Sequence, residues 1–398
     1  MKDKDRIDKT VKTLTPELKE LSRKIHDNPE VGLEEFKALM WQTELIKKHG
    51  FDVEENYCGM PTAYRAVYKG KKTGPKIALI SEYDALPEIG HACGHNLICM
   101  IGVGAGIGLK EFADEYGGEV YIYGTPAEEN VGGKLPMVAA GAFDDIDAVL
   151  EVHPACIHTD SWNSSAFGGL FIEFFGRASH AAASPEGGLN ALDAMILLFN
   201  SIALMRQQTK EDARIHGVIR NGGTAPGIIP EYTRAEVMAR AYRVSDVYDL
   251  LDRIKAAADG AALATGCKVK YYPSEEGYKD TVSNQTLSKR AAGYAEEQGY
   301  KLKWFNGAHA QGASDLGNVS YVCPSIQLMC GIGTSPDGTE FGLHTRYLEE
   351  RAGTDEAMDI ALDYIKVLIA VGIDLMTEPE FLAEIKEEFA HVNETKGM

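Results

Sequence analysis

Three short apolar runs, separated by stretches with helical spacing, constrain the fold of this chain more than any other feature. The runs cover residues 76–81, 119–124 and 148–152. The stretches between them, near 93–116 and 132–140, carry apolar residues at the period of a helix. Strands that alternate with helices predict an α/β fold with a mostly parallel, doubly wound sheet.

Two helices are expected before this region. Thr15-Pro16-Glu17 has the pattern of an N-cap followed by proline at the first helical position, so we expect a helix to begin there. A second helix is expected over residues 34–49, ending before Gly50.

The order of elements changes after about residue 167. We expect strand, helix, strand, strand, helix, strand over residues 170–175, 188–208, 214–220, 232–242, 247–265 and 268–272. This order is that of a split βαβ, ferredoxin-like module. Helical patterns near 284–298 and 355–376 then resume the first domain. The sequence therefore predicts a first domain of residues 1–166 and 280–398, interrupted by an inserted domain of residues 167–279.

Charge and cysteine usage exclude several classes of function. The 398 residues carry 40 Lys and Arg against 59 Asp and Glu, a formal charge of −19. Such a surface repels phosphate backbones and anionic lipids, so we expect neither a nucleic-acid nor a membrane partner. Seven scattered cysteines and an N-terminus without an apolar signal region predict a cytoplasmic protein.

Polar residues able to bind a metal follow each of the three apolar runs. Asp84, Cys93 and His95 come after the first run, Glu128 and Glu129 after the second, and His153 at the end of the third. The carboxyl ends of parallel strands lie at one edge of a sheet, so these side chains should converge. Thiolate, imidazole and carboxylate ligands together suit zinc, whereas carboxylate and imidazole also serve manganese.

The adjacent carboxylates Glu128 and Glu129 admit two interpretations. They form an acidic surface turn, or one binds metal while the other faces a water molecule, because neighbouring side chains of an extended chain point in opposite directions. A third interpretation makes Cys93 a nucleophile paired with a nearby histidine, but it leaves both glutamates and His153 unused.

Several motifs, in order along most of the chain, carry a family resemblance. They are EYDALP at 82–87, HACGHN at 91–96, TPAEE at 125–129, His153-Pro154 and GRASHA at 176–181. Together they resemble the amidohydrolases of metallopeptidase family M20, in the branch with aminobenzoyl-glutamate hydrolase B subunits and N-acyl-amino-acid hydrolases.

The resemblance implies a catalytic domain with two divalent metal ions and an inserted lid domain that forms a homodimer. The implied metal ligands are Cys93, His95, Glu129, His153 and His344. The resemblance further implies that Glu128 is the general base, that Asp84 orients the ligands, and that His180 reaches the active site of the opposite subunit.

One loop departs from the family pattern. Gly227 stands where the family usually has asparagine, which puts the substrate class in question more than the reaction type. Arg240 matches a family arginine that could meet a substrate carboxylate, although a surface ion pair explains it equally well.

The leading hypothesis is a metal-dependent hydrolase of the amide bond in N-acyl or N-aroyl amino acids or small dipeptides. One alternative is a non-catalytic subunit that binds a small ligand or a partner chain. The other is the amidase with a Cys93 nucleophile, which predicts inhibition by alkylation and indifference to chelators.

Overall fold

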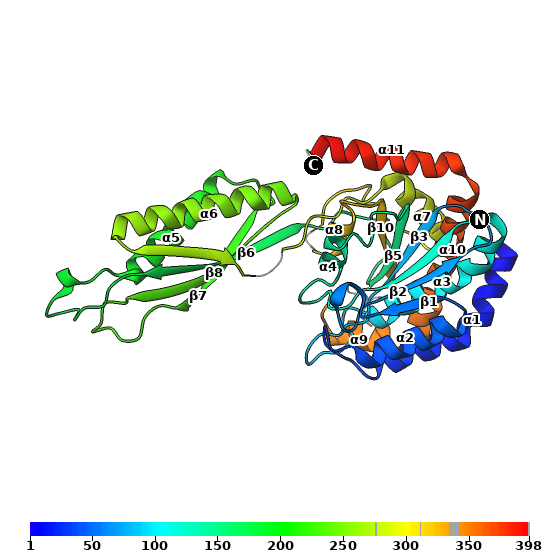
Figure 1. Cartoon of the computed structure of the whole chain (residues 1–398), viewed down its shortest axis with the longest axis horizontal. Helices are drawn as coiled ribbons and strands as arrows, with labels where there is room; N and C mark the ends of the chain where they lie inside the picture. Colours follow the sequence, from blue (N-terminus) through cyan, green and yellow to red (C-terminus); the bar gives the residue numbers. More distant parts are fainter. Residues whose placement is uncertain (275–276, 311, 334–341, 397–398) are drawn as a thin grey trace. The chain divides into compact units, whose positions relative to one another are not determined.

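A computed structural model describes residues 1–274, 277–310, 312–333 and 342–396, and the chain divides into two compact units. Unit 1 comprises Met1–Asn163, Thr281–His309 and Asp315–Met398, and unit 2 comprises Ser164–Asp280 and Ala310–Ser314. Each unit contains its own sheet (Figure 1). Unit 2 thus interrupts unit 1 in the sequence.

Unit 1 is built on a six-stranded sheet of order β1-β2-β4-β3-β5-β10. Its strands are β1 (Asp52–Glu55), β2 (Tyr64–Lys69), β3 (Lys76–Ser81), β4 (Glu119–Gly124), β5 (Ala148–Ala155) and β10 (Ser325–Gly331). The last four run parallel to one another, while β1 and β2 form an antiparallel edge. The three apolar runs are β3, β4 and β5, which confirms the predicted mostly parallel sheet.

Helices cover both faces of this sheet. They are α1 (Lys4–His26), α2 (Phe36–Lys48), α3 (His95–Tyr116), α4 (Lys134–Ala139), α7 (Gln285–Glu297), α8 (Leu316–Val319), α9 (Arg346–Ala352), α10 (Asp355–Thr377) and α11 (Pro379–Lys396). Along β3, Ile77 and Leu79 join a core shared with α1, α3 and α10, whereas Ala78 and Ile80 join one shared with α4 and α8. This alternation is the pleat of a strand buried on both faces, as a doubly wound sheet requires.

The glycines of helix α3 allow it to lie close to the sheet. A Cβ at Gly102 would lie 2.1 Å from the carbonyl oxygen of Ile80, and one at Gly106 would lie 2.4 Å from Ile122. Among the described residues, α3 is the one helix with the length and hydropathy of a membrane span, and 89% of its apolar window is buried within the protein. It is a core helix whose first residue, His95, lies beyond the end of β3.

The predicted start of the first helix is wrong. Helix α1 begins at Lys4 and contains Pro16 in its interior. Proline at position 16 removes the backbone donor that would bond the carbonyl of Lys12, but α1 buries Val11, Leu14 and Leu18 along one face. Burial of this face outweighs the helix-breaking tendency of the proline.

Unit 2 is a four-stranded antiparallel sheet with two helices. Its elements are β6 (Ala166–Phe175), α5 (Ala191–Met205), β7 (Arg214–Asn221), β8 (Tyr232–Ala241), α6 (Val244–Thr265) and β9 (Lys268–Pro273). The strand order is β7-β8-β6-β9, and one core joins the strands to α5 and α6. The predicted ferredoxin-like order is confirmed.

Candidate metal centre

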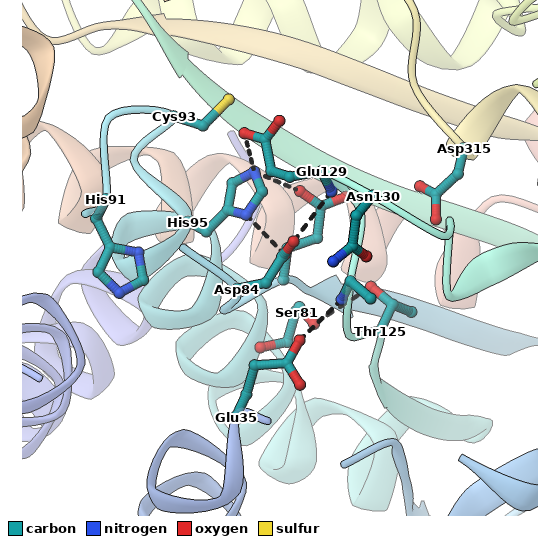
Figure 2. Close-up of polar contacts among 12 residues, drawn as sticks. Glu35, Ser81, Asp84, His91, Cys93, His95, Thr125, Glu129, Asn130 and Asp315 are labelled. Carbon is teal, nitrogen blue, oxygen red and sulfur yellow. Dashed lines mark hydrogen bonds and ion pairs between the residues drawn. The ribbon is translucent and has the colours of Figure 1, made fainter. Parts of the chain in front are cut away.

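The carboxyl ends of three adjacent strands bring the predicted polar residues together in unit 1. Strand β3 lies between β4 and β5 in the sheet, and all three run parallel. Asp84 follows β3, Glu129 follows β4, and His153 lies near the end of β5. Cys93, just before α3, and His95, its first residue, lie beside Asp84 and Glu129 (Figure 2).

His95 is oriented by Asp84. Its Nδ1 lies 2.9 Å from Asp84 Oδ1, which can only accept, so Nδ1 carries a proton and Nε2 faces the other side chains. Within the described part of the chain, His95 Nε2 has no hydrogen-bond partner although the side chain is completely buried. Burial lowers the pKa of His95, but Asp84 outweighs it and raises that pKa well above its ordinary value. A bound cation would therefore displace a proton from Nε2.

His153 presents its Nε2 in the same way. Its Nδ1 donates to the carbonyl of Pro154 at 2.7 Å, and its Nε2 lies 3.5 Å from Cys93 Sγ. Cys93 is 5% exposed, and burial raises the pKa of its thiol well above the ordinary value. The start of α3 therefore does not suffice to ionise this thiol, and a thiolate here needs a cation beside it.

Glu129 and His344 form the open side of the cluster. His344 Nε2 lies 3.2 Å from Glu129 Oε1, and the His344 side chain is 50% exposed. The backbone N–H of His344 donates to the carbonyl of Ala92, which ties the segment after residue 341 to the Cys93 loop. Burial raises the pKa of Glu129, but the nearby imidazoles of His344 and His95 outweigh it and lower that pKa.

Three overlapping groups of donor atoms result. Within each group the donor atoms lie within 4.8 Å of one another; the groups are Cys93 with His95 and His153, Cys93 with Glu129 and His344, and His95 with Glu128 and Glu129. Among the described residues, Glu82 Oε2, His95 Nε2 and Glu129 Oε1 are buried without a hydrogen-bond partner. Unpartnered buried polar atoms cost free energy, and a cation would satisfy them, so this donor set fits a metal.

Glu128 belongs to the third of these groups. Burial raises the pKa of its carboxyl well above the ordinary value, and the neighbouring carboxylates Glu82 and Asp315 raise it further. A carboxylate with a raised pKa is a stronger base than an exposed one. The pKa values of Glu128 and Glu129 are thus shifted in opposite directions.

Sequence reasoning missed a buried charge network behind the cluster. Lys134, at the start of α4, donates through Nζ to Glu82 and to Asp315, and all three side chains are completely buried. Glu82 Oε2 in turn lies 3.4 Å from His95 Nε2. Lys134 is 52 residues from Glu82 and 181 residues from Asp315 along the chain, so no local pattern reveals these pairs.

Three further predicted residues lie in unit 2. His180 is exposed, and its Nδ1 accepts from the backbone N–H groups of Ala182 and Ala183, which leaves the proton on Nε2. The carbonyl of Gly227 accepts from Ala181, so the Gly227 loop lies beside His180, and a Cβ at Gly227 would meet nothing within 4 Å. Arg240 lies over the ring of Phe167 at 5.3 Å.

Comparison with known proteins agrees with this architecture. The model of peptidase family M20/M25/M40 matches residues 78–369. The chain is 35% identical to mouse Xaa-Arg dipeptidase over 93% of this chain and 88% of the relative. It is 34% identical to the B subunit of the p-aminobenzoyl-glutamate hydrolase of Escherichia coli over 63% of this chain and 56% of the relative.

A solved structure shares the fold. The YXEP protein of Bacillus subtilis, described as a dinuclear metal-binding peptidase of the M20 family, superposes with a TM-score of 0.69 at 20% identity, covering 91% of this chain and 99% of that protein. This chain belongs to peptidase family M20/M25/M40, whose members are metal-dependent hydrolases of peptide and amide bonds.

Proposed function

We propose that this protein hydrolyses the amide bond of an N-acyl or N-aroyl amino acid or of a small dipeptide, using two divalent metal ions. The observation that carries the proposal is the convergence of buried, unpartnered ligand atoms at the ends of β3 and β4 and the start of α3. The names of the relatives agree, since one is a dipeptidase and another is a p-aminobenzoyl-glutamate hydrolase.

The proposed metal ligands are Cys93, His95, Glu129, His153 and His344. Two of the donor groups share Cys93, which supports two neighbouring cations rather than one. Zinc suits the thiolate and imidazole donors, and manganese is the alternative for the carboxylate side. Divalent cations held there would lower the pKa of water and polarise the substrate carbonyl.

Glu128 is the proposed general base. It takes a proton from the attacking water and delivers it to the leaving amine, and its raised pKa favours the first of these transfers. Asp84 holds the ring of His95 and the backbone of Glu129 at once, so it is proposed as a positioning residue.

Unit 2 is proposed to act as lid and dimerisation domain. The edge strand β7 exposes Val218 and Ile219, and α5 exposes Ile196, Leu197 and Leu204, as an interface between two copies would require. His180 of one subunit would then donate Nε2–H to the oxyanion in the other. Arg240 is proposed to meet a substrate carboxylate, and the space at Gly227 to change which acyl groups fit.

A cytoplasmic location is part of the proposal. All seven cysteines are free thiols, which suits a reducing compartment and an intact Cys93 ligand.

The test is hydrolysis of a panel of N-acyl amino acids, N-aroyl glutamates and Xaa-Arg dipeptides by enzyme reconstituted with Zn²⁺ or Mn²⁺, with metal content measured on the same samples. We expect turnover that a chelator abolishes and added metal restores. Cys93→Ser should lower metal occupancy, with Cys99→Ser, a buried cysteine within α3, as the matched control.

Two outcomes would contradict the proposal. Inhibition by alkylation together with indifference to chelators would identify Cys93 as a nucleophile. Full metal occupancy without hydrolysis of any panel member would favour the non-catalytic, ligand-binding subunit.

A further inference from the structure

The loop that carries Glu128 and Glu129 is held by a carboxylate on each side. The backbone N–H of Glu129 donates to Asp84 Oδ2 at 3.0 Å. The backbone N–H of Ala127 donates to Glu35 Oε1 at 2.9 Å, and Figure 2 shows Glu35 reaching this loop. Ala127 and Glu128 thus lie between two peptide N–H groups that each donate to a buried carboxylate.

Ala127 adopts a conformation that needs such support. Its φ is +61°, in the left-handed region that side chains other than glycine rarely occupy, and the residue is completely buried. The left-handed conformation costs an alanine about 1 kcal/mol or more. The carbonyl of Ala127 accepts from Gly132 at 2.8 Å, so the hydrogen bonds on both sides of its Cα maintain the turn into Glu128.

Burial and a second hydrogen bond fix the side chain of Glu35. Its side chain is completely buried, and its second oxygen, Oε2, accepts from the hydroxyl of Thr62 at 2.6 Å. The carbonyl of Thr62 accepts from the hydroxyl of Tyr83, next to Asp84. Both carboxylate oxygens of Glu35 are therefore committed, one to a fixed hydroxyl and the other to the Ala127 peptide.

The chain before Glu35 packs directly under the same loop. A Cβ at Gly32 would lie 2.8 Å from the Cα of Ala127 and 2.6 Å from the side chain of Asn130. The carbonyl of Glu30 accepts from the backbone of Ala85 at 2.8 Å. The segment of residues 30–35 thus contacts both halves of the centre, the Asp84 turn and the Glu128 loop.

We propose that Glu35 is a positioning residue of the hydrolytic centre, which sets the direction of Glu128 and Glu129 through the peptide N–H of Ala127. The proposal rests on the proposed function for the roles of these two glutamates. The hydrogen bonds of the Glu35 side chain go to the backbone of Ala127 and the hydroxyl of Thr62, so Glu35 would act through the backbone. Glutamine at this position keeps an oxygen for Ala127, whereas alanine removes it.

The test compares Glu35→Ala, Glu35→Gln and Thr62→Val with Glu34→Ala, an exposed neighbour that serves as matched control. Co²⁺ affinity is measured by chelator competition, the visible Co²⁺ spectrum is recorded, and kcat and KM are determined for the substrate found in the panel. We expect E35A to weaken Co²⁺ binding about 10-fold to 100-fold, alter the spectrum and lower kcat with little change in KM. E35Q should have nearly the Co²⁺ affinity, spectrum and kcat of the wild type. T62V should have values between those of E35A and the wild type, and E34A should match the wild type.

Folded E35A with wild-type Co²⁺ affinity and spectrum would overturn the proposal, whatever its activity. If E35A does not fold, T62V decides: wild-type affinity, spectrum and kcat in that variant would contradict the role of Glu35. Because the Co²⁺ measurements need no substrate, a wild-type protein that hydrolyses nothing would refute the proposed function and leave the positioning test intact.

Discussion

Asp84 uses one carboxylate oxygen for His95 Nδ1, at 2.9 Å, and the other for the backbone N–H of Glu129, at 3.0 Å. One side chain thereby fixes an imidazole and a carboxylate that come from different elements. Both oxygens act as acceptors, and neither contact can be lost without freeing one proposed ligand.

Asp84→Asn should weaken metal binding about 10-fold to 100-fold, because asparagine has one acceptor oxygen where the structure uses two. Metal affinity by competition with a chelator measures the effect. The exposed Asp52→Asn is the control and should bind metal as the wild type does. Unchanged affinity in D84N would show that His95 and Glu129 hold their positions without Asp84.

Glu128→Gln should keep the fold and the metal but lower kcat by about 10²-fold to 10⁴-fold, since an amide cannot accept the proton of the attacking water. Glu129→Gln should instead reduce metal content, because Glu129 belongs to two of the donor groups. Steady-state kinetics and metal analysis on both variants separate the two roles. A fully active E128Q would exclude Glu128 as the base.

Lys134→Met should destabilise the protein by about 3–5 kcal/mol, because it leaves Glu82 and Asp315 buried without their cation. The free energy of unfolding from urea denaturation measures this change. Lys37→Met, at an exposed position, should have little effect. A loss below about 1 kcal/mol in K134M would mean that the two acids are neutral in the native protein.

The stability of the metal-free protein should depend on the protonation of Glu35. Burial raises the pKa of this carboxyl from 4.5 to about 7. Between these values the native state keeps a proton that the unfolded chain has released, so the free energy of unfolding falls as the pH rises from about 4.5 to about 7. The loss attributable to Glu35 is at most about 3 kcal/mol.

The difference between wild type and Glu35→Gln isolates this dependence. Denaturation of both metal-free proteins at several pH values should show that the free energy of unfolding falls with rising pH more in the wild type than in E35Q. Parallel curves for the two proteins would contradict the raised pKa of Glu35.

Most of the architecture follows from local patterns in the sequence. The bounds of β3 and β4 match the predicted runs, because an apolar segment that is buried on both faces has few other ways to satisfy its side chains and backbone. The strand-end positions of Asp84, Glu129 and His153 follow from the same reasoning. The start of α1 could not be predicted in this way, since Pro16 is a strong local signal and burial against α3 and α10 outweighs it.

The sequence by itself thus determined the fold class, the inserted module and which strand ends carry metal-binding residue types. The tertiary structure alone decided how the site is supported. Lys134 forms ion pairs with Glu82 and Asp315, and Glu35 accepts a hydrogen bond from the backbone of Ala127. These partners lie between 52 and 181 residues apart. Most charged side chains of a sequence belong in solvent, and only the packing of the complete unit shows which ones are buried and must find a partner.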